Sequence, residues 1–347
     1  MVTLKDIAAE AGVSVMTVSR VVNGKFSKVS DGNIHKIQSI IEKRGYVPSQ
    51  SARSLSSHAS RIIAVIVQGD ATAMEYPYNA ALIGRICLHI QEHNDSSMLY
   101  YAFDYRDITK RLRSWYVEGA IFLGMFDQNM RQIREDNQIP LVFTDSYSSE
   151  RQITNVGIDD YKGGELAARY FLEMGHRRMG FVGGFFNSSS VVRQRLHGFE
   201  HALEEAGFPL EEECILTDIP ETETLSRLCR GENPVTAFFV PADVNALRLI
   251  GILTSMGLRV PEDCSIIGFD DIYFAAYSSP GLTTVRQDIG KKSRLAADLL
   301  FRHIEDPKAP AENITLDVQI VERASVRRLD PPGCKAPQAP AAVTAVE

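Results

Sequence analysis

The chain has 347 residues, 44% of them hydrophobic, and a formal net charge of −7. This length predicts two or three domains, and the overall acidity argues against a generally basic nucleic-acid binder. No apolar run approaches the roughly 20 residues of a membrane span, and the N-terminus lacks a signal-peptide pattern, so we expect a cytoplasmic protein without a membrane partner. The five cysteines have no metal-ligand spacing, which favours free thiols and no metal site.

The charge is unevenly distributed along the chain. Residues 1–61 contain nine Lys or Arg against four Asp or Glu, a formal charge of +5, which leaves −12 for the remainder. A basic segment on an acidic body favours a local DNA-binding module, because neutralisation of phosphates supplies most non-specific affinity. A merely solvated helical face is the alternative.

Residues 1–48 have the pattern of a helix-turn-helix domain. Thr3 can cap a first helix with one apolar face, and Gly12 ends it. Ser14 can cap a second helix, which packs through Val18, Val21 and Val22. Its other face is left to contact a partner and carries Val15, Met16, Ser19 and Arg20. Such a second helix places its N-terminal side chains against base edges in the major groove.

A basic loop at 24–28 precedes a third predicted helix. Ser30 can cap this helix, which ends near Arg44 before Gly45 and buries Ile34, Ile37, Ile40 and Ile41. Lys25, Lys28 and Lys36 are candidates for phosphate contacts, which position a protein on DNA without reading sequence. Solvated surface is the alternative for each lysine.

Five ordered segments, 3–14, 17–23, 29–30, 45–49 and 52–55, resemble the headpiece of the lactose-repressor (LacI/GalR) family of bacterial transcription regulators. The resemblance implies base-reading roles for Val15, Met16 and Arg20. It implies contacts with the DNA backbone for Thr3, Ser14, Thr17, Ser19, Asn23 and Tyr46. A guanidinium can donate two hydrogen bonds to a guanine edge, whereas apolar side chains offer only shape and methyl contacts. We therefore expect thymine methyls or close packing opposite Val15 and Met16, unless Met16 is only an exposed filler residue.

Residues 49–61 are expected to form a hinge helix and linker. The run 50–55 is too short to be stable alone in water. In the resembled family this hinge folds against its twin from a second subunit on DNA, which implies that Leu55, with Ala52 beside it, wedges into the minor groove. Ser49 stands where the family usually has Asn, and both residues cap helices well. An inert flexible linker is the alternative.

From residue 62 to 328 apolar runs alternate with amphipathic segments. The runs at 61–68, 120–126, 140–145, 177–184, 237–243 and 264–271 have the character of buried parallel strands, and helical stretches at 81–93, 163–175, 195–207 and 245–257 lie among them. This alternation predicts doubly wound parallel α/β sheets. The resemblance implies two lobes like those of a periplasmic sugar-binding protein, one near 62–159 and 289–317, the other near 160–288 and 318–328. The tail 329–347 is expected to be disordered, and because it lacks the leucine-rich helix of family tetramers, we expect a homodimer.

Ligands of open α/β sheets bind beyond the carboxyl ends of the strands. Polar residues at these ends are Asp145, Asn187, Ser189 and Asp270, and Arg195 follows in the next helix. The resemblance implies effector contacts for Asp145, Arg195 and Asp270, with a strand-end turn or an interlobe ion pair as alternatives. Two departures from the family matter: Ala242 leaves Asp243 alone after its strand, and Tyr76, Tyr78 and Asn79 stand at the mouth of the expected cleft.

Carboxylates and a guanidinium suit the hydroxyls of a sugar, so a carbohydrate is the first expected effector. A purine, a nucleoside or a partner protein is the alternative within the same class. A sugar-binding protein without a regulatory role would not need residues 1–55. The chain has no GxGxxG, P-loop, GxSxG or HExxH motif, and we expect neither an enzyme nor a cofactor; His176 has the context of a turn or packing residue. The expected DNA partner is a pseudo-palindromic operator, matched to the two-fold axis of a dimer.

Overall fold

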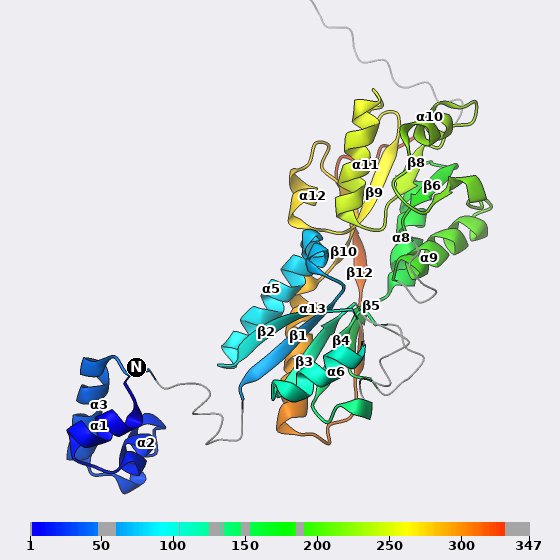
Figure 1. Ribbon diagram of the computed structural model, residues 1–347. Coiled ribbons are helices and arrows are strands. Elements are labelled where there is room, and N and C mark those ends of the chain that lie inside the picture. Colours follow the sequence, from blue (N-terminus) through cyan, green and yellow to red (C-terminus); the bar gives the residue numbers. More distant parts are fainter. Residues whose placement is uncertain are drawn as a thin grey trace, which may run out of the picture. The chain divides into compact units, whose positions relative to one another are not determined.

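The computed structural model describes residues 2–47, 60–103, 105–124, 133, 135–146, 153–184 and 191–329. It divides the chain into two units, Met1–Arg61 and Ile62–Glu347 (Figure 1). The predicted DNA contacts Ala52 and Leu55, the predicted ligand contacts Asn187 and Ser189, and the tail from residue 330 onward lie outside the described residues.

The first unit contains the three predicted helices, α1 (Leu4–Ala11), α2 (Val15–Val22) and α3 (Asp31–Arg44). Thr3 caps α1 through a reciprocal pair of hydrogen bonds. Its hydroxyl accepts from the Asp6 N–H at 3.3 Å, and the Asp6 carboxylate accepts from the Thr3 N–H at 2.8 Å. The segment predicted as a basic loop contains a short 3₁₀ helix, η1 (Phe26–Lys28).

Two glycines end the outer helices of this unit. Gly12 follows α1 at φ 69° and Gly45 follows α3 at φ 58°, in the left-handed region that a residue without Cβ adopts at no cost. The turns close the helices around one small core. Its buried members are Ile7, Ala8, Ala11, Val18, Val21, Ile37 and Ile40.

The second unit contains two six-stranded sheets. The first sheet is parallel throughout and has the order β11-β5-β4-β3-β1-β2. Its strands β1, β3 and β4 are central and nearly all buried, which explains their continuous apolar sequence. The strands are β1 (Ile62–Gln68), β2 (Ser96–Ala102), β3 (Gly119–Leu123), β4 (Leu141–Thr144), β5 (Asn155–Ile158) and β11 (Asn313–Leu316).

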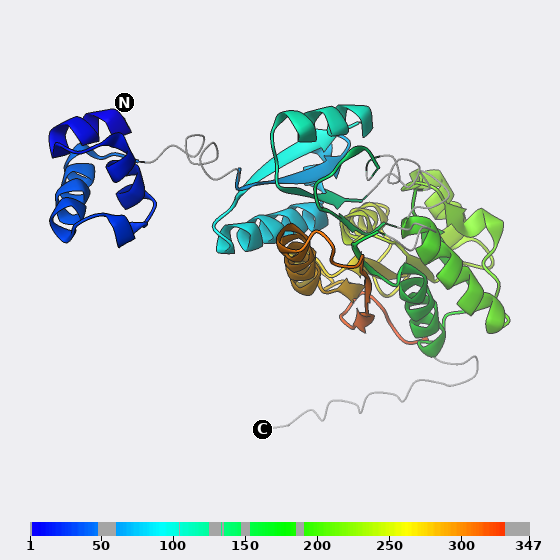
Figure 2. The same ribbon diagram turned by 90° about the horizontal axis from the view of Figure 1, so that it is seen from below.

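Helices cover both faces of this first sheet. Alternate residues of β1 point to opposite faces: Ile63 packs with α5 (Pro77–Glu92) and α13 (Ile289–Glu305), whereas Ile66 packs with α6 (Tyr105–Ser114). Figure 2 shows α5 and α13 side by side below the sheet and α6 above it.

The second sheet has the order β12-β10-β9-β8-β6-β7. It is parallel except for β12, which pairs antiparallel with β10 and departs from the expected wholly parallel sheet. The reason is the connection: only Asp317 separates β11 from β12, so the extended chain runs from the first sheet into the second at its carboxyl edge. The strands are β6 (Met179–Val182), β7 (Ile215–Leu216), β8 (Ala237–Phe239), β9 (Ser265–Asp270), β10 (Thr283–Gln287) and β12 (Val318–Val321).

Two helices on one face of the second sheet pack unusually closely. A Cβ added to Gly164 of α8 (Asp160–Glu173) would lie 1.9 Å from the Arg195 carbonyl oxygen. A Cβ added to Gly198 of α9 (Val191–Glu205) would lie 1.9 Å from the Tyr161 carbonyl oxygen. These glycines let the two backbones touch. The remaining helical segments are η2 (Ala71–Glu75), η3 (Glu212–Cys214), α10 (Thr222–Arg230), α11 (Asp243–Ser255) and α12 (Tyr273–Tyr277).

The predicted fold class is confirmed: a three-helix unit is followed by an α/β body with two largely parallel sheets. The chain passes between these sheets three times, after β5, after β10 and after β11. Among the described helices, none is long and apolar enough to span a bilayer. His176 is buried, with its two ring nitrogens bonded to the Thr236 hydroxyl at 2.9 Å and the Arg327 carbonyl oxygen at 3.1 Å, and it serves packing as expected.

Candidate functional site

Helix α2 presents an exposed reading face. Val15 is 41% exposed and Met16 is 64% exposed, although both are apolar. Arg20 lies one turn further on, and its Nη2 is 3.5 Å from Met16 Sδ. The core residues Val18 and Val21 occupy the opposite side of the helix, so the three side chains stand together on the free face.

The polar residues of this helix organise its two ends. The Ser14 hydroxyl accepts from the Thr17 N–H at 3.1 Å and caps the N-terminus, and the two hydroxyls lie 2.9 Å apart. At the other end the Asn23 amide donates to the Ser19 carbonyl oxygen at 2.8 Å. These four predicted DNA-backbone contacts therefore also fix the ends of α2.

The remaining predicted DNA contacts lie around the rim of the same unit. Thr3 is exposed at the start of α1, and Lys28 is exposed at the end of η1. Tyr46 is half-buried and packs against the helical core after α3. All three residues belong to the first unit.

In the second unit a buried polar cluster joins the ends of strands from both sheets; we call it the ligand cluster. Its members are Tyr78, Asp145, Arg195, Asp270, Gln287 and Lys292. The Lys292 ammonium lies 2.5 Å from Asp145 Oδ1, and the Tyr78 hydroxyl donates to Asp145 Oδ2 at 2.8 Å. Burial first, and then the charges of Asp145 and Asp270, raise the pKa of the Tyr78 phenol well above its usual range.

Gln287 connects this ion pair to the second sheet. Its side-chain oxygen Oε1 accepts from the Lys292 ammonium at 2.7 Å, and its side-chain Nε2 donates to Asp270 Oδ1 at 2.6 Å. Burial raises the pKa of Asp270 to about 6, against the lowering effects of Arg195, Gln287 and Lys292. Asp270 is therefore a carboxylate that gains from any further hydrogen-bond donor.

Arg195 is held against the second sheet. Its Nε lies 2.6 Å from Asp160 Oδ1, and its Nη1 donates to the Pro241 carbonyl oxygen at 2.7 Å. The guanidinium carbon lies 3.5 Å from the ring centroid of Phe269, in the stacked position of a cation–π contact. Arg195 thus forms an ion pair within the expected second lobe, whereas the alternative considered from the sequence was an ion pair between the lobes.

Asp243 lies behind the cluster. Its side chain is fully buried, with one oxygen accepting from the Thr284 hydroxyl at 2.5 Å and the other from the Ile272 N–H at 2.9 Å. Burial, followed by the charge of Asp270, raises the pKa of Asp243 well above its usual range. The geometry gives Asp243 the role of holding the turn after β9.

Tyr76 and Asn79, the two other residues predicted at the cleft mouth, lie at the start of α5. Tyr76 is 48% exposed in the position before α5. Asn79 turns its amide back to the Ala73 carbonyl oxygen at 2.9 Å and pins η2. Of this predicted trio, only Tyr78 reaches the ligand cluster through a described hydrogen bond to a charged side chain.

Sequence reasoning missed Lys292, Gln287 and Asp160. For Lys292 the signal was present: it shares one helical face with Ala296, Leu299 and Leu300, so a lysine stands where an apolar residue is expected. Its buried side chain, with 0% exposure, is the outcome of that spacing.

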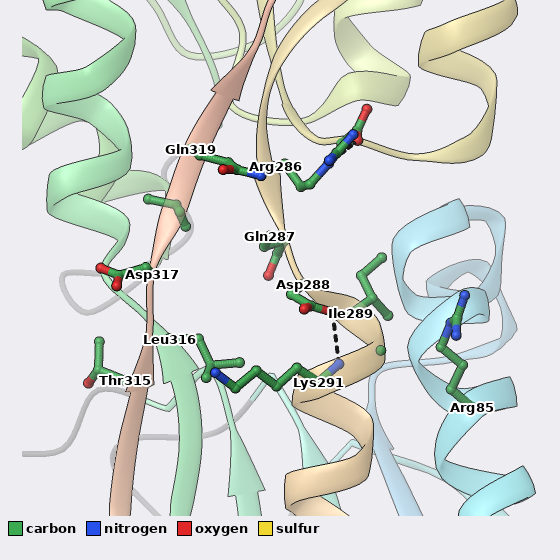
Figure 3. Close-up of a pocket in the computed structure, with 13 residues that line it drawn as sticks. Arg85, Arg286, Gln287, Asp288, Ile289, Lys291, Thr315, Leu316, Asp317 and Gln319 are labelled. Atoms are coloured by element: carbon green, nitrogen blue, oxygen red, sulfur yellow. Dashed lines mark hydrogen bonds and ion pairs between the residues drawn. The ribbon is translucent and has the colours of Figure 1, made fainter.

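A separate pocket of about 650 Å³ lies beside two of the connections between the sheets (Figure 3). Residues 286–291 and 315–319 line it, together with Arg85 and Asp271. The dashed line in Figure 3 marks the hydrogen bond from the Lys291 N–H to Asp288 Oδ1, 2.8 Å long, which caps α13. Gln287 borders both this pocket and the ligand cluster.

Family models match both units. The model described as bacterial regulatory proteins, lacI family, matches residues 3–49. The model of periplasmic binding proteins and the sugar-binding domain of the LacI family matches residues 62–230, and a periplasmic binding protein-like domain matches residues 168–326.

Similar proteins span nearly the whole chain. The repressor PurR of Edwardsiella ictaluri is 34% identical over 94% of this chain and 97% of its own length. The repressor ExuR of Bacillus subtilis (strain 168) is 32% identical over 95% and 99%. Among solved structures, the Lac repressor dimer bound to operator and the anti-inducer ONPF is 25% identical over 94% and 99%, with a TM-score of 0.81. The CelR–cellobiose complex is 26% identical over 94% and 100%, with a TM-score of 0.69. These matches show that the chain belongs to the LacI family of bacterial regulatory proteins.

Proposed function

We propose that the protein is a transcriptional repressor that binds a pseudo-palindromic operator as a homodimer and responds to a carbohydrate held by the ligand cluster. One combination carries the proposal: an exposed reading face on α2 and a buried charged cluster between two sheets occur in one chain. The named relatives are repressors, not enzymes, which agrees with this combination.

The DNA-reading part of the proposal rests on α2. Arg20 reads a guanine edge through two hydrogen bonds, while Val15 and Met16 select for thymine methyls or for close packing. The exposure of these two apolar side chains supports the assignment, since a water-facing surface gains nothing from them. Thr3, Ser14, Thr17, Ser19, Asn23, Lys28 and Tyr46 contact the DNA backbone, and Leu55 with Ala52 bends the minor groove between two paired hinges.

The effector part of the proposal rests on Asp145, Asp270 and Arg195. Carboxylates accept hydrogen bonds from neighbouring hydroxyls, and Asp270 still has one oxygen without a hydrogen-bond donor among the described residues. Two family structures, both 26% identical to this chain, were solved with carbohydrates: CelR with cellobiose and an Enterococcus faecium regulator with ribose. Tyr76, Asn79, Asn187, Ser189 and Asp243 complete the site as further contacts or supports.

A purine or nucleoside is the second candidate effector. The aromatic side chains of Tyr76 and Tyr78 fit a purine as well as a sugar, because a phenol ring stacks on a base as readily as it covers the apolar face of a sugar. Tyr76 is 48% exposed and is therefore accessible to such a ligand.

The proposed mechanism links the cluster to the hinge. Ligand binding changes the angle between the lobes, which moves the two linkers of the dimer, so that the hinge helices pair on DNA in only one state. A ligand shifts this equilibrium only by its differential affinity for the two states. The similarity to an operator-bound Lac repressor dimer supports the dimeric arrangement.

Two experiments on the full-length protein test the proposal. Selection from random duplex DNA should enrich a pseudo-palindrome with half-sites about one helical turn apart. A thermal-shift screen of neutral sugars, sugar acids, purines and nucleosides should find a sugar that raises the unfolding midpoint by mass action. An asymmetric site bound by a monomer, or stabilisation by nucleosides alone, would contradict the respective part.

A further inference from the structure

Lys292 is the most completely enclosed charged side chain of the ligand cluster. It lies in the first turn of α13 with 0% exposure, and its ammonium has three acceptors. These are Asp145 Oδ1 at 2.5 Å, Gln287 Oε1 at 2.7 Å and the Tyr78 hydroxyl at 2.8 Å. An ammonium has three protons, so the protein itself satisfies the cation fully.

The partners of Lys292 come from both sheets. Asp145 follows β4 of the first sheet, whereas Gln287 ends β10 of the second and donates to Asp270 at the end of β9. The Tyr78 side chain packs against the apolar clusters of both sheets. The Lys292 nitrogen is thus the point through which hydrogen bonds run from one sheet to the other.

Both carboxylates at the ends of this chain of hydrogen bonds sit on unusual backbone. Asp145 has φ 52° and Asp270 has φ 112°, in the region that L-residues rarely adopt. Such conformations persist where the surroundings over-determine them. Here Lys292 and Tyr78 hold the Asp145 carboxylate, and Gln287 holds that of Asp270.

Stability alone explains Lys292 poorly. Replacing a buried ion pair with well-packed apolar residues is often neutral or stabilising. An apolar side chain at position 292 would also continue the buried face of α13 that Ala296, Leu299 and Leu300 form. A lysine there carries a desolvation cost that an apolar residue would avoid, which points to a role in the response to ligand.

We propose that Lys292 is a positioning residue that ties the two sheets together and passes ligand binding at Asp145 and Asp270 on to the DNA-binding unit. This inference rests on the proposed function. A ligand that takes up either carboxylate must alter the hydrogen bonds around the Lys292 ammonium, and with them the preferred arrangement of the two sheets. Removing the ammonium should therefore change operator affinity even without a ligand.

The test compares Lys292→Met with Lys291→Met in the full-length protein. Lys291 is the next residue of the same helix, is exposed, and within the described residues forms hydrogen bonds only through its backbone. Fluorescence anisotropy measures the Kd of each variant for a duplex that the wild-type protein selected from random DNA. We expect Lys292→Met to change the Kd at least fivefold and Lys291→Met to leave it within twofold of wild type. A higher Kd means that Lys292 stabilises the arrangement that binds DNA. A lower Kd means that it stabilises the arrangement that releases DNA.

A second variant covers the case in which Lys292→Met does not fold. Gln287→Met removes the link between Lys292 and Asp270 while Lys292 keeps its ion pair with Asp145, and should change the Kd in the same way to a smaller extent. A folded Lys292→Met protein, or failing that a folded Gln287→Met protein, with a Kd within twofold of Lys291→Met overturns the inference. If the wild-type protein selects no DNA, the proposed function fails and this inference fails with it, before any variant is compared.

Discussion

The guanidinium of Arg195 lies 2.6 Å from the carboxylate of Asp160, and both side chains are buried in the second unit. Asp160 begins α8 directly after the chain has left the first sheet, and Arg195 belongs to α9. The pair therefore fixes one connection between the sheets against the helix that carries a predicted effector contact.

Replacing Arg195 with Met should lower the free energy of unfolding by roughly 3–5 kcal/mol, because the buried Asp160 carboxylate then loses its ion pair with Arg195. Urea denaturation of the full-length protein measures this loss. The matched control is Arg169→Met, which breaks exposed pairs with Glu165 and Glu205 and should cost less than about 1 kcal/mol. An Arg195→Met protein as stable as the control would show that the buried pair of Arg195 and Asp160 does not stabilise the fold.

Asp270→Asn should stabilise the protein at neutral pH. Burial raises the pKa of Asp270 to about 6 in the folded protein, against 3.8 for an ordinary carboxyl group. Between these values the folded state binds the proton more tightly, so the contribution of Asp270 to stability falls as the pH rises through this window. The amide removes a cost of about 3 kcal/mol at pH 7.5 and little at pH 4.

Unfolding midpoints of Asp270→Asn and wild type at the two pH values check this prediction. Other titrating groups are common to both proteins, so the difference between the midpoints isolates Asp270. A midpoint for Asp270→Asn below that of wild type at pH 7.5 is the contrary result.

Gly198→Ala should prevent α8 and α9 from packing. The new Cβ would lie 1.9 Å from the Tyr161 carbonyl oxygen, and a backbone atom cannot move aside as a flexible side chain can. We expect a loss of more than about 3 kcal/mol or no folded protein. Gly84→Ala in α5 is the control: no atom lies within 4 Å of its Cβ, and alanine should stabilise the helix by up to about 1 kcal/mol. Circular dichroism melts distinguish the two outcomes.

Arg20→Ala should lose selectivity for the operator while keeping non-specific DNA affinity. Loss of a bidentate contact with guanine corresponds to roughly 1–3 kcal/mol, about 5- to 150-fold in Kd. Lys36→Ala on α3 should instead weaken binding to all sequences by the same factor, and this factor should be smaller than the loss that Arg20→Ala causes on the operator. Anisotropy titrations against the selected duplex and a scrambled duplex separate the two patterns. If Arg20→Ala lost the same affinity for both duplexes, Arg20 would contact the DNA backbone and not a guanine base.

Local chemistry made the headpiece predictable. Thr3 and Asp6 form their capping box within four residues, and Gly12 and Gly45 end helices through their own backbone conformation. Each of these features depends only on residues that are close together in sequence, so it can be predicted from the sequence. The presence of η1 was missed because a single 3₁₀ turn leaves no periodicity.

The ligand cluster was predictable only in part. Asp145 and Asp270 could be named because both follow apolar strands, yet Asp243 follows a strand in the same way and lies fully buried behind the site. Asp243 differs from Asp145 and Asp270 because of the order of the strands in the sheet and because its carboxylate accepts from the hydroxyl of Thr284, 41 residues away in sequence. Lys292 contacts Asp145 although the two residues are 147 positions apart in sequence, and no local sequence pattern predicts such a contact. A lysine on the apolar face of its helix was the one available signal.

The most direct test of the central claim is the operator affinity of wild-type and Asp270→Asn proteins, measured with and without the sugar that stabilises the wild type. The account predicts that the sugar changes the wild-type Kd by about tenfold, within the usual range of allosteric coupling, and the Kd of Asp270→Asn by less than about twofold. An equal change in both proteins, or no change in a wild-type protein that binds the sugar, would contradict it.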